Sequence, residues 1–315
     1  MNIRIGFILS LSALHLMPMK IESVFRYQGH KDALFALGVH PQTGHIWSGG
    51  GDGFIVEWIP MQTDGQLISK LPRPVYSFHS DSQTKQLLAG TASGNLHLID
   101  LIEKKELRNI EGHTLGLFDI KQTGDLLLTA GGDGRINTWD ITNFSLLQSW
   151  AASDKACRVM AINKEGNLFA AGYSDNFIRL FKIESGRLSQ IHEWEAHTNS
   201  VFALAFNPLT GELWSGGRDA MLKVWNSNYQ LLADIPAHNY HINAISFSPD
   251  GALAATVSMD KTLKIWESKS QKLLKVADRF KMDAHTNSVN KVVWLNNEEL
   301  VSAGDDRLLF HWKIS

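Results

Sequence analysis

The sequence predicts an all-β fold built from seven copies of one four-stranded unit, and three observations support this prediction. A tryptophan recurs at a regular spacing, together with a histidine, a serine or threonine, and an aspartate. Short alternating segments and glycine-containing turns fill the intervals between these positions, as is typical of strands and hairpins. No stretch shows sustained helical periodicity. A repeated unit can extend through all 315 residues, so length alone does not divide the chain into domains.

Five tryptophans set the period of the repeat. Each lies six residues after an aspartate, a serine or threonine lies four residues before that aspartate, and a histidine precedes it by 20 to 22 residues. The five sets are His30, Ser48, Asp52 and Trp58; His113, Thr129, Asp133 and Trp139; His197, Ser215, Asp219 and Trp225; His238, Thr256, Asp260 and Trp266; and His285, Ser302, Asp306 and Trp312. Five copies in register indicate one repeated structural unit.

Two further units are hidden in the two longest gaps. The intervals from Trp58 to Trp139 and from Trp139 to Trp225 are about twice as long as the others. Ile99 occupies the tryptophan position in the first interval, and Phe181 occupies it in the second. The chain therefore contains seven units, spaced by 40 to 46 residues.

Each unit is expected to contain four strands. In the fifth unit, residues 201–206 and 213–217 form a hairpin around a proline- and glycine-containing turn. Residues 221–225 alternate as a third strand, and residues 231–235 form the fourth strand before the next histidine.

The two ends of the chain predict a closed ring. The last unit stops at Ile314 and Ser315, directly after its third strand. An additional strand, residues 21–27, precedes His30. Pairing of residues 21–27 with residues 308–313 would complete the last unit, so that no unit lacks its outer strand.

A repeat of this length with four strands, a histidine and a terminal tryptophan resembles the WD40 family. The resemblance covers about residues 20–315 and implies one seven-bladed β-propeller of antiparallel blades. The tryptophan positions are then 58, 99, 139, 181, 225, 266 and 312. The literal Trp-Asp pair occurs once, at Trp139–Asp140, and such departures are common in families of this kind.

Residues 1–19 are expected to lie outside this fold. The apolar run from Ile5 to Met17 follows one positive charge at Arg4, as in a secretory signal. The run is too short to cross a bilayer, and no small-residue cleavage site follows it. We therefore interpret it as a dispensable leader translated from an upstream start, and expect a cytoplasmic protein. The alternative is export, with residues 1–17 acting as a signal peptide.

The composition argues against several classes of function. A formal net charge of -2 provides no long-range field for nucleic acid or an anionic membrane, so neither partner is expected. The single Cys157 excludes an internal disulfide framework and a multi-cysteine zinc site. The periodic histidines lie in different units and cannot converge on one ion. We expect no metal and no cofactor.

The recurring histidine, serine or threonine, and aspartate have the residue types of a hydrolase triad. The set occurs five times, however, whereas catalysis needs one copy in a pocket, and no G-x-S-x-G motif is present. A buried polar chain explains the pattern better: the aspartate accepts from the histidine, the histidine meets the hydroxyl, and the hydroxyl meets the tryptophan N–H. The resemblance implies the same structural role. We therefore expect no catalytic residues and a protein that is not an enzyme.

The resemblance implies that partners bind on the face around the narrow end of the central channel. Three positions per unit supply this face: three and five residues after the histidine, and the residue before the aspartate. In units without the histidine, Tyr76 and Met160 are placed by aligning Val75 and Val159 with Val201. The predicted partner-binding residues are Phe35, Tyr76, Phe118, Arg158, Met160, Phe202, Arg218 and His241.

These residues predict a non-catalytic scaffold, because aromatic side chains and arginine dominate interaction hot spots. We expect a protein or peptide partner with an apolar anchor and an acidic group, and a chain that is a monomer or a subunit of a larger complex. One alternative is that the aromatic side chains only plug the channel mouth. The competing functional class is a hydrolase or a small-ligand binder with its site at that mouth.

Overall fold

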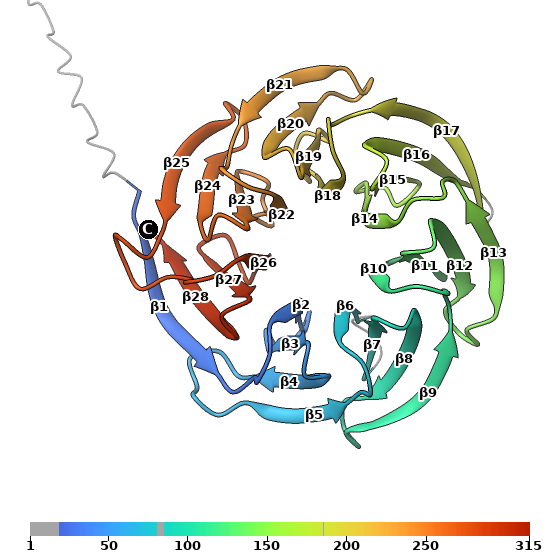
Figure 1. Cartoon of the computed structure of the whole chain (residues 1–315), viewed down its shortest axis with the longest axis horizontal. Coiled ribbons are helices and arrows are strands. Elements are labelled where there is room, and N and C mark those ends of the chain that lie inside the picture. The colour runs from blue at the N-terminus through green and yellow to red at the C-terminus, as the bar shows by residue number, and fades with distance from the viewer. Residues whose placement is uncertain (1–18, 81–84, 185) are drawn as a thin grey trace, which may run out of the picture.

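Seven four-stranded sheets surround a central axis in the computed structural model, which describes residues 19–80, 85–184 and 186–315 (Figure 1). All regular elements in these residues are strands, paired antiparallel within each blade. The predicted seven-bladed β-propeller is confirmed. No helix capable of spanning a membrane occurs among the described residues. Most of the predicted leader, residues 1–18, lies outside them.

The strands of the first six blades follow one another in the chain, from the inner strand at the axis to the outer strand at the rim (Figure 1). In blades one to three they are β2 (Leu34–Val39), β3 (Ile46–Gly50), β4 (Phe54–Trp58) and β5 (Gln66–Lys70); β6 (Val75–His79), β7 (Gln86–Thr91), β8 (Asn95–Asp100) and β9 (Lys105–Glu111); and β10 (Leu117–Thr123), β11 (Leu126–Gly131), β12 (Arg135–Asp140) and β13 (Leu146–Ala151). In blades four to six they are β14 (Cys157–Ile162), β15 (Leu168–Tyr173), β16 (Phe177–Glu184) and β17 (Arg187–Glu195); β18 (Val201–Phe206), β19 (Leu213–Gly217), β20 (Met221–Trp225) and β21 (Leu231–Pro236); and β22 (Ile242–Phe247), β23 (Leu253–Ser258), β24 (Leu263–Glu267) and β25 (Lys272–Ala277).

The seventh blade joins the two ends of the chain, as predicted. It contains β26 (Val289–Trp294), β27 (Glu299–Gly304), β28 (Leu308–Ile314) and, as its outer strand, β1 (Ile21–Gln28). Strand β1 pairs antiparallel with β28 from Ile21 opposite Ile314 to Gln28 opposite Leu308. Figure 1 shows β1 and β28 side by side at the seam of the ring. The chain terminus therefore supplies the edge partner that the last blade lacks.

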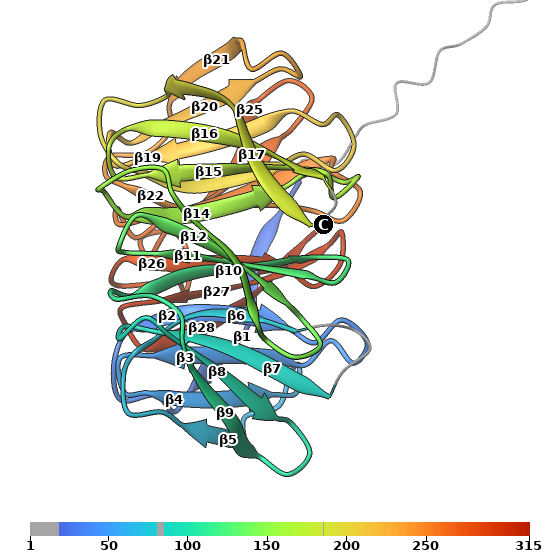
Figure 2. The ribbon, with the colours of Figure 1, turned by 90° about the vertical axis from the view of Figure 1, so that its right-hand side faces the viewer.

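The hydrophobic core is divided among the contacts between blades. Among the described residues, seven clusters of buried side chains each combine residues of two neighbouring blades. The cluster at the seam contains Tyr27, Trp58 and Leu309. Each blade thus buries both faces of its sheet against its neighbours, and the side view shows the blades stacked face to face (Figure 2).

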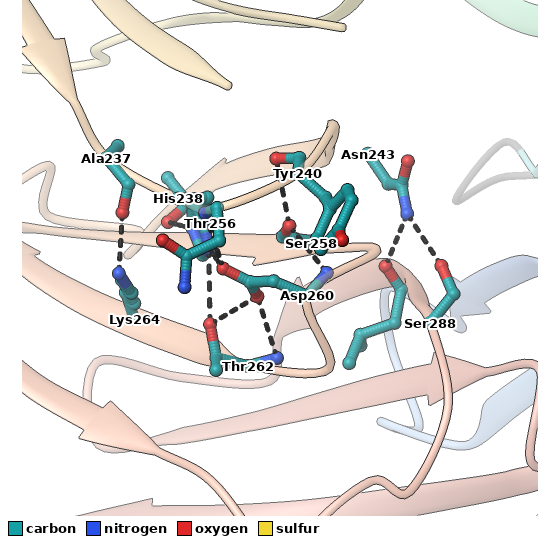
Figure 3. A network of polar contacts seen from close by, with 12 residues as sticks. Ala237, His238, Tyr240, Asn243, Thr256, Ser258, Asp260, Thr262, Lys264 and Ser288 are labelled. Carbon is teal, nitrogen blue, oxygen red and sulfur yellow. Dashed lines mark hydrogen bonds and ion pairs between the residues drawn. The ribbon is translucent and has the colours of Figure 1, made fainter. Parts of the chain in front are cut away.

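Within each of five blades, a chain of hydrogen bonds runs from the tryptophan to the serine or threonine, then to the histidine and then to the aspartate. In the sixth blade, the Trp266 Nε1–H donates to Thr256 Oγ1 at 2.9 Å, and this hydroxyl lies 2.8 Å from His238 Nε2. His238 Nδ1 lies 2.9 Å from the Asp260 carboxylate, which also accepts from the backbone N–H of Asn239 (Figure 3). With a proton on Nδ1, every donor in the chain has an acceptor, which burial requires.

We call each set of tryptophan, serine or threonine, histidine and aspartate a tetrad. The tetrads of blades one, three, five and seven repeat this geometry. The tryptophan-to-hydroxyl distances are 2.7, 3.0, 2.9 and 2.8 Å, and the hydroxyl-to-histidine distances are 2.7, 2.8, 2.8 and 2.8 Å. In each blade the aspartate ties the loop before the inner strand to the turn between the second and third strands. The tetrads thereby connect the second and third strands of five blades to the loops on one face of the ring.

The fourth blade replaces the missing histidine with a different polar network. Asp175 accepts from Ser153 Oγ at 2.7 Å and pairs with Arg179 at 2.9 Å. The Arg179 guanidinium is largely buried and lies over the Tyr173 ring, 4.6 Å from the ring centroid, which is within the distance of a cation–π contact. Phe181, in the tryptophan position, stacks on Phe169 with 4.7 Å between ring centroids. The degenerate repeat therefore retains an anchored aspartate without a histidine.

Tyr27 provides a test of the ring closure. Its side chain is fully buried, its hydroxyl lies 3.2 Å from His311 Nδ1, and it accepts a hydrogen bond from the backbone of Met61 at 3.2 Å. We expect Tyr27→Ala to lower the free energy of unfolding by about 4 kcal/mol, because a large side chain is lost from the seam. Tyr27→Phe keeps the ring and should cost about 1 kcal/mol per lost hydrogen bond. Denaturant titration checks both values, and an unchanged midpoint for Tyr27→Ala would contradict the role of the seam.

The tetrad aspartates predict a loss of stability in acid. Burial by itself would raise the pKa of Asp219, but the hydrogen bond from His197 and those from the backbone lower it to about 2, from 3.8. A depressed carboxylate pKa stabilises the fold above the unfolded value, and this stabilisation disappears as the pH falls through the folded value. We expect Asp219 to contribute about 2 kcal/mol at neutral pH, lost between about pH 4 and pH 2.

The variant Asp219→Asn tests this contribution. Its free energy of unfolding should be lower than that of the wild type at pH 7 and should change less between about pH 4 and pH 2. The matched control is Asp154→Asn, since Asp154 lies in an exposed loop and pairs with the exposed Lys155. Urea unfolding at each pH measures the difference. Parallel pH curves for Asp219→Asn and the wild type would be inconsistent with a stabilising tetrad carboxylate.

Candidate functional site

Every inner strand contains an irregularity at the same position. The register of pairing with the second strand shifts there by one residue, for example between Val201 and Ala203. An extra residue of this kind is left out of the ladder and its side chain is redirected. The seven extra residues are Phe35, Tyr76, Phe118, Arg158, Phe202, Asn243 and Asn290. One side chain from each blade is therefore directed to the mouth of the channel.

Six side chains at this mouth form a continuous arc of contacts. The rings of Phe35 and Tyr76 meet edge to face with 5.6 Å between centroids, and Tyr76 stacks on Phe118 at 5.6 Å. The Arg158 guanidinium lies over Phe118 at 4.5 Å and over Phe202 at 5.7 Å. The arc ends where Phe202 contacts the ring of His241 at 5.6 Å. These contacts hold the side chains in fixed positions around the opening.

The two remaining blades close the ring with amides. Asn243 Nδ2 donates to Ser288 Oγ at 3.0 Å and to the carbonyl of Val289 at 2.9 Å (Figure 3). Asn290 Nδ2 donates to the carbonyl of Leu34 at 2.9 Å and to Asp305 Oδ1 at 2.6 Å. These bonds connect blade six to blade seven and blade seven to blade one. They make this side of the mouth polar.

The arc and the amides enclose a pocket of about 380 Å³ at the channel mouth. Its lining contains no acidic side chain and consists of Phe35, Tyr76, Phe118, Arg158, Phe202, His241, Asn243, Asn290 and Lys291. The aromatic side chains are partly buried and border this space, so they leave room at the mouth. The pocket has the composition of a binding site, with apolar walls and a few polar groups.

Positive charge gathers on one side of the pocket. Arg158 Nε donates to Ser174 Oγ at 2.9 Å, and Arg218 Nε donates to His241 Nε2 at 3.3 Å. Burial lowers the pKa of Arg158, and Arg218 adds to this effect by repulsion. Burial and Arg218 likewise lower the pKa of His241. The site therefore holds positive charge that favours an anionic group on a ligand.

The structure brings together most of the residues predicted for partner binding. Phe35, Tyr76, Phe118, Arg158, Phe202 and His241 line one pocket, and Arg218 is exposed beside it. The remaining predicted residue, Met160, does not belong to this group.

The placement of Met160 at the mouth was wrong. Met160 is 1% exposed and belongs to a core cluster between blades three and four. In the fourth blade Cys157, rather than Val159, corresponds to Val201 at the start of the inner strand. Side chains of a strand alternate between its two faces with a period of two residues. An alignment that is shifted by two residues therefore keeps the same pattern of buried and exposed positions, and the pattern does not reveal the error. Arg158 occupies the position that Met160 was expected to fill.

Some residues near the mouth were missed. Lys291 lines the pocket directly after Asn290, and the exposed side chains of Leu115 and Tyr240 lie in loops of the same face. The signal for Lys291 was a charge in an inner strand, at a position where four other blades have alanine or serine. Lys291 lies outside the three positions per blade that the resemblance assigns to this face.

The tetrads and the acidic residues offer no metal centre in the described part of the chain. There, no group of three or more His, Cys, Asp or Glu side chains is arranged to hold a metal ion. The tetrad serines and threonines are fully buried, and each hydroxyl is bonded to both a tryptophan and a histidine. These hydroxyls are structural links and are not presented to the pocket.

Seven four-stranded blades, a repeated buried tetrad and a lined channel mouth define a repeat-built β-propeller. The chain belongs to the WD40 repeat family. The family model, described as WD domain, G-beta repeat, matches residues 104–140, 188–226, 229–267 and 278–313. These segments contain the inner three strands of blades three, five, six and seven.

Curated relatives match parts of the chain at low identity. The chain is 24% identical over 219 residues to "WD repeat-containing protein 91 homolog" of Dictyostelium discoideum, covering 65% of this chain and 28% of that protein. It is 25% identical over 175 residues to "WD repeat-containing protein 90" of Xenopus tropicalis, covering 52% and 9%. It is 27% identical over 135 residues to "THO complex subunit 6 homolog" of Danio rerio, covering 39% and 41%. The matches span less than half of each relative's length.

A pair of variants separates the mouth position from the core position. We expect Met160→Ala to lower the free energy of unfolding by about 3 kcal/mol, because it opens a cavity between two blades. Arg158→Ala should cost at most about 1 kcal/mol, the scale of a partly exposed cation–π contact. Chemical denaturation of both proteins provides the comparison. A larger loss for Arg158→Ala than for Met160→Ala would reverse the two assignments.

Proposed function

We propose that this chain is a non-catalytic scaffold that binds a peptide or a protein loop at the mouth of its central channel. The observation that carries the proposal is the continuous arc from Phe35 to His241, which borders a pocket with no acidic lining. Membership of the WD40 repeat family supports an interaction role. The name of one relative, THO complex subunit 6 homolog, describes a subunit of a complex, in agreement with a protein partner.

The arc has the physical properties of an interaction hot spot. Aromatic side chains and arginine contribute large contact areas, and they contribute most where water is excluded. Because the rings already pack on one another, little side-chain entropy remains to be lost on binding. The proposed partner inserts an apolar side chain against the rings and presents an acidic group to Arg158 and Arg218. Such a segment complements both the apolar wall and the positive side of the pocket.

A hydrolytic site at the same mouth is less well supported. General acid–base catalysis requires a titratable group that can reach the substrate. His241 already accepts a hydrogen bond from Arg218, and Asp305 accepts one from Asn290. The buried tetrad hydroxyls lie within the blades. Binding without chemistry therefore accounts for the arrangement of these residues with fewer assumptions.

The double variant Phe118→Ser/Phe202→Ser tests the proposal. Both rings are partly buried at the mouth, and Arg158 lies over both of them. We expect the variant to lose capture of partner proteins in a quantitative pull-down from the source cell, while the free energy of unfolding falls by no more than about 2 kcal/mol. The matched control is Leu147→Ser/Leu232→Ser, which removes two exposed apolar side chains from the outer strands β13 and β21.

The two readouts distinguish a binding arc from a plug. Equal capture by the mouth variant and the wild type would reject the proposed site. A drop in unfolding free energy of more than about 4 kcal/mol, the scale of a core aromatic deletion, together with unchanged capture would show that the rings fill the mouth for stability.

A further inference from the structure

Directly below the mouth, a second ring of side chains faces the channel. Each follows the bulged residue of its inner strand, and together they line a cavity of about 250 Å³. The seven residues are Ala36, Ser77, Asp119, Val159, Ala203, Ala244 and Lys291. Five of them have short or apolar side chains, which leaves the space open. The two charged members are Asp119 and Lys291.

The carboxylate of Asp119 is already fully engaged. Its Oδ1 accepts from Lys121 Nζ at 2.9 Å and from the backbone N–H of Ile120 at 2.9 Å. Its Oδ2 accepts from the backbone N–H of Met160 at 2.7 Å. Lys121 therefore balances the charge of Asp119, and the charge of Lys291 is left without a counter-ion in the cavity.

Lys291 and Arg158 retain unused hydrogen-bond donors. Within residues 19–80, 85–184 and 186–315, the Lys291 ammonium forms no hydrogen bond and no ion pair, although it carries three N–H donors. Arg158 uses one of its five N–H donors, in the bond to Ser174. Burial lowers the pKa of Lys291; Asp119 opposes this effect and Lys121 adds to it. Lys291 is half-buried, and a cation that loses part of its hydration without gaining a partner costs free energy, which a bound anion offsets.

The mouth pocket and the cavity beneath it share the two cations. Arg158 and Lys291 line both spaces, as do Phe202 and Asn243. A group that enters between the aromatic rings therefore meets Arg158 and Lys291 at the junction of the two spaces. A single negative charge suits this junction better than a doubly charged phosphate, because the Asp119 carboxylate, although it is paired with Lys121, lies in the same cavity and adds some repulsion.

We propose that the channel mouth recognises a carboxylate on a peptide segment of the partner, which passes the aromatic arc and binds to Lys291 and Arg158. The inference rests on the proposed function and specifies the chemistry of the partner. The carboxylate has two possible sources, an Asp or Glu side chain within the segment or the C-terminus of the partner chain. Both present the same group to the two cations.

The test uses random heptapeptide libraries displayed in two formats, one with the peptide inside a chain and one with a free C-terminal carboxylate. The full chain, its Lys291→Met variant and the mouth variant Phe118→Ser/Phe202→Ser are compared. Lys155→Met is the matched control, since it removes one exposed lysine from a loop on the same face. We expect the wild type and the Lys155→Met protein to enrich peptides that combine an apolar residue with a carboxylate. The format that yields the enriched peptides identifies the source of the carboxylate.

Synthetic versions of the enriched peptides give the quantitative readout. Replacing Glu by Gln, Asp by Asn, or the C-terminal carboxylate by an amide should weaken binding to the wild type by about 10- to 100-fold, the range for a charge-assisted hydrogen bond. Lys291→Met should weaken binding of the acidic peptide to the same extent and should bind the neutral peptide as the wild type does. Its thermal midpoint should be equal to or above that of the wild type, because a desolvated charge is removed.

The possible failures are distinguishable. Enrichment of apolar peptides without a carboxylate overturns the carboxylate inference and leaves the proposed function intact. A strongly destabilised Lys291→Met protein would show that Lys291 supports the fold, and would also overturn it. Failure of the wild type to enrich any peptide beyond the level of the mouth variant overturns the proposed function itself.

Discussion

The antiparallel pairing of β1 with β28 is the constraint on which the rest of this structure depends. An open row of seven blades would have two edges and no defined axis, whereas the pairing from Ile21–Ile314 to Gln28–Leu308 makes the row into a ring. The channel mouth exists because the seven inner strands then surround one axis. Contacts across the seam, such as Asn290 with the carbonyl of Leu34, complete the mouth between the seventh and first blades.

Two local features recur along the chain, and they have different roles: the tetrads stabilise the blades, and the bulges place side chains at the channel mouth. The tetrads connect the second and third strands of five blades to the loops of one face, and the bulge in each inner strand directs one side chain to the axis. The tetrad residues are nearly invariant among five blades because each buried donor needs its acceptor. The bulged residues vary from phenylalanine to arginine and asparagine because no strand pairing depends on their side chains. The blades therefore differ from one another at the mouth, which agrees with the proposal that the partner binds there.

The mouth differs from the tetrads in how completely its polar groups are paired. The tetrads pair each donor, and even the degenerate fourth blade pairs Asp175 with Ser153 and Arg179. Arg158 and Lys291, in contrast, hold donors without acceptors beside a partly buried aromatic wall. Local rules are relaxed at functional sites more than elsewhere in a fold. The unpaired donors of Arg158 and Lys291 support the proposal that the mouth is a binding site.

The sequence by itself determined the repeat, the number of blades, the tetrad residues and the pairing of the two ends, because each follows from fixed spacing along the chain. It also indicated Phe35, Phe118 and Phe202, which lie at a constant distance from a histidine. Only the tertiary structure decided that Arg158, and not Met160, reaches the mouth, because without a histidine the two-residue period of a strand permits a slip of two. It also decided the position of Lys291, because a bulge changes which side chains line the channel. The charge of Lys291 lacks a counter-ion because Asp119, in the third blade, is paired with Lys121 of the same strand.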